Sequence, residues 1–257
     1  NLPKTNPAYR IFSSPQVQKG MLACAEWADV LSVSTTYLKK VVEKNWGHLT
    51  NVVTKKPIPV MVYENRVDPT FFVPKPYEER EYITIGWAGS NTHAGDLAEV
   101  WPILFKILNE YKNVKLELVG HNAPFKHERV IQKEWVHISE YTYCISNWNW
   151  DIFLAPLEQH KFNDSKSNIK LQEAGILGRP CLAGQAKPYE DFCKGNPRLE
   201  WQLCSIPLRW ENKLKTLIED KSLRFELGKE MREHTLEHFH IQDIEKDWDA
   251  IAVEAMR

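Results

Sequence analysis

Three charged side chains recur at helical spacing in the stretch NDSKSNIKLQEAGILGRP, residues 163–180. Lys166, Lys170 and Glu173 occupy positions i, i+4 and i+7, which lie within about 60° of one another on a helix. Two lysines near the start of a helix repel each other by roughly 0.2–0.5 kcal/mol, and the helix dipole disfavours cations there. A bound diphosphate would offset both penalties, and the carboxylate would accept hydrogen bonds from a ribose diol. The alternative is a solvated helix face on which Lys170 and Glu173 form an ion pair.

A second polar segment, GWAGSNTHAGDL at residues 86–97, closes a strongly apolar run. Gly89 permits a tight turn, Ser90 adds a donor, and the start of the following helix offers free backbone N–H groups to a phosphate. The spacing is not G-x-G-x-x-G, so the segment lacks the dinucleotide-binding fingerprint. The alternative is an ordinary strand-to-helix turn that is capped by Thr92 or Asp96.

The elements that would position these segments alternate between strand and helix. Apolar runs predict strands at 29–34, 59–65, 82–89, 114–120, 135–139, 151–157 and 179–184. Helical patterns predict helices at 15–28, 35–45 and 96–111, and in about three segments from residue 210 onward. This alternation predicts an α/β fold with a doubly wound parallel sheet, which binds ligands at the carboxyl ends of its strands.

The composition excludes several classes of protein. The 257 residues are 43% hydrophobic and 26% charged, with a net charge of −1, which argues against broad binding to nucleic acids or anionic membranes. No apolar run approaches the roughly 18 residues of a membrane span and no signal peptide is visible, so we expect a cytoplasmic protein. The cysteines lack C-x-x-C spacing and indicate reduced thiols: Cys24, Cys144, Cys181, Cys193 and Cys204.

Together these segments resemble the retaining glycosyltransferases of the GT-B fold, in the group 1 or family 4-like class. The segment IGWAGSNTHAGDL is similar to a GWAGSPTHRGDL-like segment of that family. Residues 151–184 match its donor-site signature, which runs from D-I-x-L-x-P-L to K-S-x-x-K-x-x-E-x-x-x-x-G-x-P. The similarity covers nearly the whole chain in the correct order.

The resemblance implies three parts of the chain. Residues 1–72 would form a partial N-terminal, acceptor-side domain and linker, and residues 73–240 a Rossmann-like domain that binds a nucleotide-sugar. Residues 241–257 would form a C-terminal helix that crosses back to the N-terminal part. Because the chain begins without Met and without an obvious first strand, we expect that much of the acceptor domain lies upstream.

The resemblance also implies roles for single residues in donor binding. Glu173 matches the second glutamate of the family's E-x7-E motif, which binds the donor ribose. Lys166 and Lys170 match basic residues near the diphosphate, and Gly89 and Ser90 match the turn beside the phosphates. The implied reaction needs neither a metal ion nor a cofactor, because the nucleotide-sugar is the substrate.

Two positions depart from the family pattern. Ser165 stands eight residues before Glu173, where the family has the glutamate that meets the donor sugar. We therefore include Ser165 among the expected donor-binding residues, with Asn163 or Asp164 as candidate substitutes for that glutamate. Ala94 stands where many relatives carry Arg or Lys to stabilise the leaving diphosphate. Loss of that cation removes a charge-assisted contact of about 1.5–3 kcal/mol.

The remaining polar and aromatic candidates carry weaker signals. His93 matches a histidine of the family segment and is our only candidate for a catalytic residue. His121 in VGHNAP ends a strand and could line the same cleft. Trp148 and Trp150 could stack on sugar faces, although tryptophans more often lie in a core.

Three functions follow for testing. The first is a glycosyltransferase, as in polysaccharide biosynthesis, that moves a sugar with retention from a UDP- or GDP-sugar to a glycan, protein or nucleic-acid acceptor. The second is a non-catalytic module on the same fold that binds a nucleotide-sugar or a partner. The third is an epimerase or hydrolase, which would need a further acid–base pair near Glu173.

Overall fold

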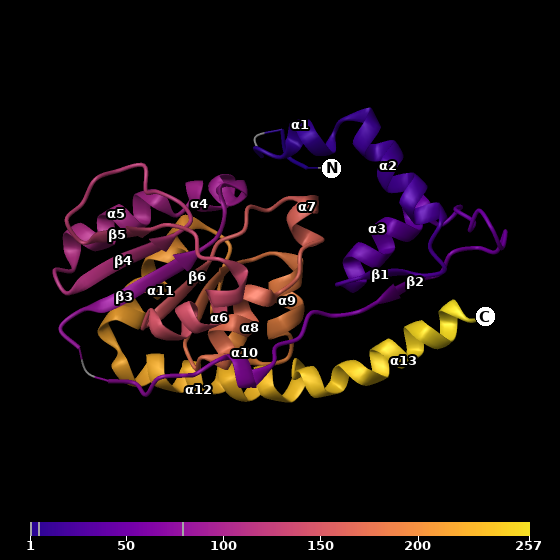
Figure 1. The fold of residues 1–257 in the computed structure, drawn as a ribbon. Helices are drawn as coiled ribbons and strands as arrows, with labels where there is room; N and C mark the ends of the chain where they lie inside the picture. Colours follow the sequence, from indigo (N-terminus) through magenta and orange to yellow (C-terminus); the bar gives the residue numbers. More distant parts are fainter. Residues whose placement is uncertain (1, 5, 79) are drawn as a thin grey trace.

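The computed structural model describes residues 2–4, 6–78 and 80–257, and its larger part is a six-stranded sheet in the order β5-β4-β3-β6-β7-β8 (Figure 1). The strands are β3 (Ile83–Ala88), β4 (Val114–Val119), β5 (Val130–Lys133), β6 (Ile152–Ala155), β7 (Cys181–Gly184) and β8 (Leu203–Cys204). Every neighbouring pair in this sheet is parallel, which confirms the predicted doubly wound α/β class.

Helices cover both faces of the sheet. They are α4 (Ala94–Ala98), α5 (Trp101–Glu110), α6 (Ile138–Asn147), α7 (Lys161–Asp164), α8 (Ile169–Ile176), α9 (Lys187–Cys193), α10 (Pro197–Glu200), α11 (Pro207–Glu219) and α12 (Lys221–His238), with the 3-10 turn η2 (Asn91–His93). Strand β6 shows how the two cores arise, because successive side chains point to opposite faces. Ile152 and Leu154 join the core formed with α4, α5 and α11, whereas Phe153 and Ala155 join the core formed with α6, α8 and α9.

The predicted helix at 96–111 is two helices in the structure, α4 and α5. Pro102 lies in the first turn of α5, where its missing N–H costs nothing, so the chain restarts a helix there. The apolar stripe of the prediction is confirmed at four positions that are at most 1% exposed: Leu97, Val100, Leu104 and Leu108.

The predicted strand at 135–139 is wrong. The strand in this region is β5, which ends at Lys133, and α6 begins at Ile138. Because β5 is an edge strand with three exposed residues, it lacks the continuous apolar run by which buried parallel strands are found. The opposite edge strand, β8, is also missing from the prediction, because its two buried residues are too short a run to be recognised.

A smaller part of the chain precedes the sheet. It contains α1 (Tyr9–Phe12), α2 (Pro15–Glu26), β1 (Leu31–Val33), α3 (Thr36–Trp46) and β2 (Val60–Val62), followed by the 3-10 turn η1 (Pro69–Phe71). β1 and β2 pair in parallel and α3 connects them, so the predicted strand–helix–strand unit is confirmed.

The C-terminal helix runs back to this smaller part (Figure 1). After the turn η3 (Ile241–Asp243), α13 (Ile244–Ala255) brings Trp248 to Tyr63, with ring centroids 4.9 Å apart. Arg66 forms an ion pair of 3.2 Å with Asp247 of the same helix. The two parts are therefore joined by α13, while the predicted domain boundaries stay predictions.

Helix α8, which carries the charged face, packs against α12 through glycines. A Cβ atom at Gly175 would lie 2.1 Å from Oγ1 of Thr235. A Cβ atom at Gly228 of α12 would lie 2.2 Å from the backbone oxygen of Gly178, which ends α8 at a φ of +66°. The position of α8 thus depends on backbone approach that only glycine allows.

We expect the substitution Gly228→Ala to lower the free energy of unfolding by about 1–3 kcal/mol, because the added methyl group meets backbone that cannot rotate away. Urea denaturation measures this change. Gly20→Ala is the control, because Gly20 lies within α2 with no atom within 4 Å of the added group, and it should gain about 0.5–1 kcal/mol. Equal effects of the two substitutions would contradict the packing described for α8 and α12.

Candidate functional site

The two polar segments of the sequence meet at one edge of the sheet. Residues 86–97 include the end of β3 and the turn after it, and residues 163–180 follow β6, its neighbour. The chain adds β4 and β5 on one side of β3 and then crosses to add β6, β7 and β8 on the other. Ligands of open α/β sheets bind at the carboxyl ends of strands where the order reverses in this way.

A buried carboxylate joins the two segments. Asp96, only 6% exposed, accepts hydrogen bonds at Oδ2 from His93 Nδ1 at 2.8 Å and from Lys166 Nζ at 3.2 Å. Its Oδ1 accepts from Asn163 Nδ2 at 2.7 Å and from the backbone N–H of Glu158 at 3.0 Å. We call these residues the Asp96 cluster.

The charge state of Asp96 follows from these partners. Burial acts to raise the pKa of this carboxyl group, but the hydrogen bond from His93, the charge of Lys166 and the N–H of Glu158 together hold the pKa below its ordinary value. Asp96 is therefore ionised at neutral pH. The sequence suggested it only as a helix cap, because its partners in the loop after β6 lie more than sixty positions away.

The structure corrects the position of Lys166. This residue lies in the bend between α7 and α8, and only Lys170 and Glu173 lie on helix α8. The predicted repulsion of two lysines on one helix face is therefore wrong. The bend turns Lys166 toward Asp96, so the ion pair across the two loops, and not helical spacing, sets its position.

His93 has a defined orientation. Because ionised Asp96 accepts from Nδ1, that nitrogen carries the proton, and Nε2 keeps its lone pair. Burial lowers the pKa of His93 more than Asp96 raises it, and Lys170 and Lys166 lower it further. The imidazole is thus neutral at neutral pH and can accept a proton, while its catalytic role stays a prediction.

Lys170 and Glu173 lie beneath the end of β3. Lys170 Nζ donates to the backbone oxygen of Ala88, the last residue of β3, and lies 5.3 Å from the centroid of the Trp87 ring. Glu173 Oε2 accepts from the hydroxyl of Tyr141 at 3.1 Å. Burial lowers the pKa of Lys170 and raises that of Glu173, and in each case their mutual attraction opposes the effect.

The turn after β3 requires glycine at one position. A Cβ atom at Gly89 would lie 2.6 Å from Cζ2 of Trp87, so no side chain fits there. Ser90 is exposed, and its hydroxyl group lies 2.6 Å from that of Thr92. The predicted turn is thus present beside Lys170, with an exposed hydroxyl group and the first turn of η2 and α4 next to it.

The structure separates the candidates for the missing glutamate. Ser165 donates its hydroxyl to the backbone oxygen of Lys161 at 3.1 Å. Asn163, only 3% exposed, donates its amide to Asp96 and to the oxygen of Glu158 at 2.8 Å, so it holds the loop and has no amide proton for a sugar. Asp164 instead lines the cavity described next.

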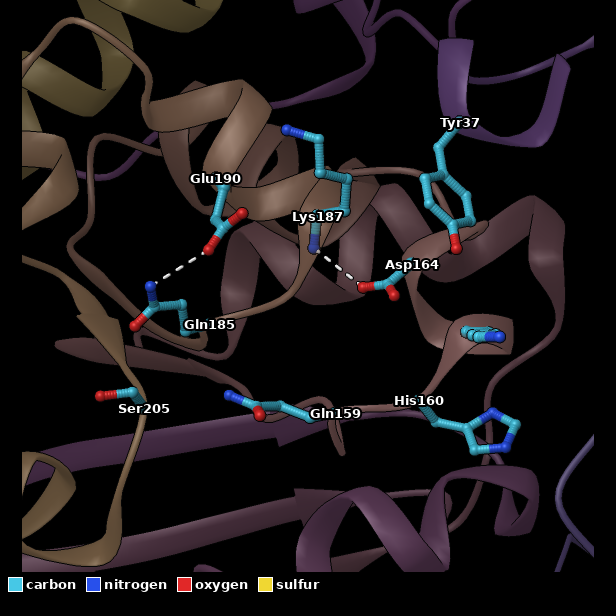
Figure 2. A pocket seen from close by; sticks show the side chains of 9 residues that line it. Tyr37, Gln159, His160, Asp164, Gln185, Lys187, Glu190 and Ser205 are labelled. Carbon is cyan, nitrogen blue, oxygen red and sulfur yellow. Dashed lines mark hydrogen bonds between the residues drawn. The ribbon is translucent and has the colours of Figure 1, made fainter. Parts of the chain in front are cut away.

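An open cavity of about 680 Å³ lies beside α7 (Figure 2). Its walls come from the loop after β6, from α7 and α9, from the ends of β7 and β8, and from α3 of the N-terminal part. The lining residues are Tyr37, Gln159, His160, Lys161, Asp164, Gln185, Lys187, Glu190 and Ser205. No local pattern in the sequence indicates this cavity, because its walls come from four separate stretches of chain: residue 37, residues 159–164, residues 185–190 and residue 205.

The weaker candidates lie mostly in packed positions. His121 stacks on Trp101 with ring centroids 6.1 Å apart, and burial lowers its pKa. Trp150 is 2% exposed, and Trp148 stacks on it with ring centroids 4.9 Å apart, so both tryptophans belong to the core.

Two further properties concern the described residues as a whole. No three His, Cys, Asp or Glu side chains among them are grouped so that they could hold a metal ion. None of their helices is long and apolar enough to cross a bilayer.

Several solved structures have a fold similar to that of this chain. No family model matches the chain, and no curated protein matches it in sequence. Among solved structures, TarM is similar with a TM-score of 0.66 and 15% identity over 91% of this chain. HepE of Anabaena, solved with UDP and glucose, has a TM-score of 0.67 and 13% identity over 93% of this chain. The trehalose-6-phosphate synthase OtsA has a TM-score of 0.62 and 13% identity over 98% of this chain.

These similarities show a fold of the GT-B type, as predicted. The chain spans 45% of the length of TarM, 67% of HepE and 65% of OtsA, so it corresponds to a part of such proteins. At identities of 13–15% the fold is what the comparisons establish.

Proposed function

We propose that this chain contains the donor-binding part of a glycosyltransferase that moves a sugar from a nucleotide-sugar to an acceptor with retention. The reaction would need no metal ion and no cofactor. Gly89 and Ser90 would bind the diphosphate together with Lys166 and Lys170, and Glu173 would bind the ribose hydroxyls.

The main support for the proposal is the position of the three charged side chains. Lys166, Lys170 and Glu173 lie at the carboxyl ends of β3 and β6, beside a turn in which Gly89 admits no side chain. Cations and exposed N–H groups suit phosphates, and a half-buried carboxylate suits a diol. The solved HepE complex with UDP and glucose has a similar fold, which supports the same class of ligand.

A second candidate function is a non-catalytic module that binds a nucleotide-sugar. The observation in its favour is that both cations already have protein partners, Lys166 on Asp96 and Lys170 on the backbone of Ala88. Ala94, at the start of α4, adds no third cation. A site with this arrangement binds a diphosphate but stabilises its departure weakly.

Incubation of the chain with UDP-glucose, GDP-mannose and ADP-glucose in EDTA separates the two functions. The proposal expects slow release of one nucleoside diphosphate, with the freed sugar first in the donor's anomeric configuration by NMR. Release with the opposite configuration, or only after addition of a divalent cation, would contradict retention or metal independence. Binding of a nucleotide-sugar without any release would favour the non-catalytic module.

A further inference from the structure

We propose that the open cavity beside α7 binds an uncharged, hydroxyl-rich carbohydrate, which is the acceptor of the transfer. The acceptor role rests on the proposed function, whereas the binding of carbohydrate rests on the cavity alone. At about 680 Å³ the cavity lies within the range of roughly 300–1,000 Å³ that is usual for small-molecule sites.

The lining groups match a ligand rich in hydroxyls. Within the part of the chain that the structure describes, the side chains of Tyr37, Gln159 and Ser205 make no hydrogen bond to protein, so their donors and acceptors face the cavity unpaired. Gln185 donates to Glu190 at 3.1 Å, which leaves the amide oxygen and the second carboxylate oxygen as acceptors (Figure 2). Amides and carboxylates of this kind bind neighbouring hydroxyl groups in pairs.

The charges of the cavity argue against a polyanion. Lys161 and Lys187 are matched by Asp164 and Glu190, and Lys187 Nζ is already bound to Asp191 at 2.6 Å. Nucleic acids bind where cations are in excess, since phosphate neutralisation dominates their affinity. A balanced, polar lining without an aliphatic side chain also disfavours lipids.

The place of the cavity fits an acceptor. Asp164 lines it, and Lys166, two residues further on, belongs to the Asp96 cluster at the proposed phosphate site. A carbohydrate in the cavity would therefore lie next to the proposed donor. Tyr37, from α3, adds an aromatic ring to the lining, and the apolar face of a sugar can pack against such a ring (Figure 2).

The test screens the chain on an array of neutral, sulfated and phosphorylated oligosaccharides together with DNA oligonucleotides. We expect retention of neutral oligosaccharides, and the strongest of them then serves as the probe in saturation-transfer NMR and titration. Gln159→Ala and Tyr37→Ala should each raise its Kd by about fivefold or more, because each removes a contact without removing a protein hydrogen bond. Ser205→Trp should abolish binding by filling the cavity.

The controls keep the inference separate from the proposed function. Gln18→Ala, on exposed α2, should leave the Kd for the oligosaccharide unchanged, and all three cavity variants should bind nucleotide as the natural chain does. Failure to retain any neutral oligosaccharide, or preferred binding of DNA or charged glycans that the cavity variants weaken, would overturn the inference. Loss of nucleotide binding with carbohydrate binding intact would instead overturn the proposed function alone.

Discussion

Replacement of Asp96 with Ala is expected to lower the free energy of unfolding by about 2–4 kcal/mol. This carboxylate is 6% exposed. It accepts hydrogen bonds from the side chains of His93, Lys166 and Asn163 and from the backbone N–H of Glu158. Without it, the ammonium group of Lys166 loses its carboxylate partner, and the buried amide of Asn163 loses one of its two acceptors. Urea denaturation at pH 7 measures the loss.

The pH dependence of this effect has a fixed sign. Because the pKa of Asp96 is lower in the folded chain, its stabilisation is complete above the ordinary pKa of an aspartate and is lost as pH falls through the lowered folded pKa. The difference between the natural chain and Asp96→Ala should therefore shrink in acid. Asp249→Ala, on exposed α13, is the control and should stay within about 0.5 kcal/mol. If the two substitutions cost the same at pH 7, the Asp96 cluster does not hold the loops together.

Lys170→Met is expected to weaken nucleotide binding by about 10- to 100-fold without loss of stability. A charge-assisted hydrogen bond to phosphate contributes about 1.5–3 kcal/mol. The folded chain gains little from this ammonium group, because burial already lowers its pKa. Isothermal titration with the bound nucleoside diphosphate measures the affinity, and thermal denaturation measures the stability.

The pH dependence of stability tests the lowered pKa of Lys170 separately. A lysine whose pKa is lowered by folding makes the folded chain more stable as pH rises from the folded pKa to the unfolded one. The natural chain should show this gain as the pH rises toward the ordinary pKa of a lysine, and Lys170→Met should not. Lys229→Met, on the exposed face of α12, should change neither property. Unchanged nucleotide affinity in Lys170→Met would remove this residue from the site.

The sequence was sufficient to predict the parts of the site that depend on local spacing. Lys170 and Glu173 lie three positions apart on a real helix, and the turn at Gly89 follows a strand whose apolar run is unmistakable. The sheet itself was predictable wherever strands are buried on both faces. The edge strands β5 and β8 were not, because three of the four residues of β5 are exposed and β8 is only two residues long.

The parts of the site that depend on contacts between distant residues could not be predicted from the sequence. Lys166 has the spacing of a helical residue, but it lies in the bend before α8. There it forms an ion pair with Asp96, which is seventy positions away in the sequence. Tyr141, which donates to Glu173, and Tyr37, which faces the cavity, carry no spacing signal at all. Such contacts are set by the order of strands in the sheet, and no local pattern reports them.

The central claim is that Glu173 binds the ribose of a nucleotide. Its most direct test is isothermal titration of the chain with UDP, GDP and ADP in EDTA, for the natural sequence and for Glu173→Ala. We expect one nucleotide to bind and its Kd to rise at least about 30-fold in Glu173→Ala, because hydrogen bonds to a charged group contribute about 1.5–3 kcal/mol each. Equal affinity of the two chains for that nucleotide, or binding of none of the three, would contradict the account.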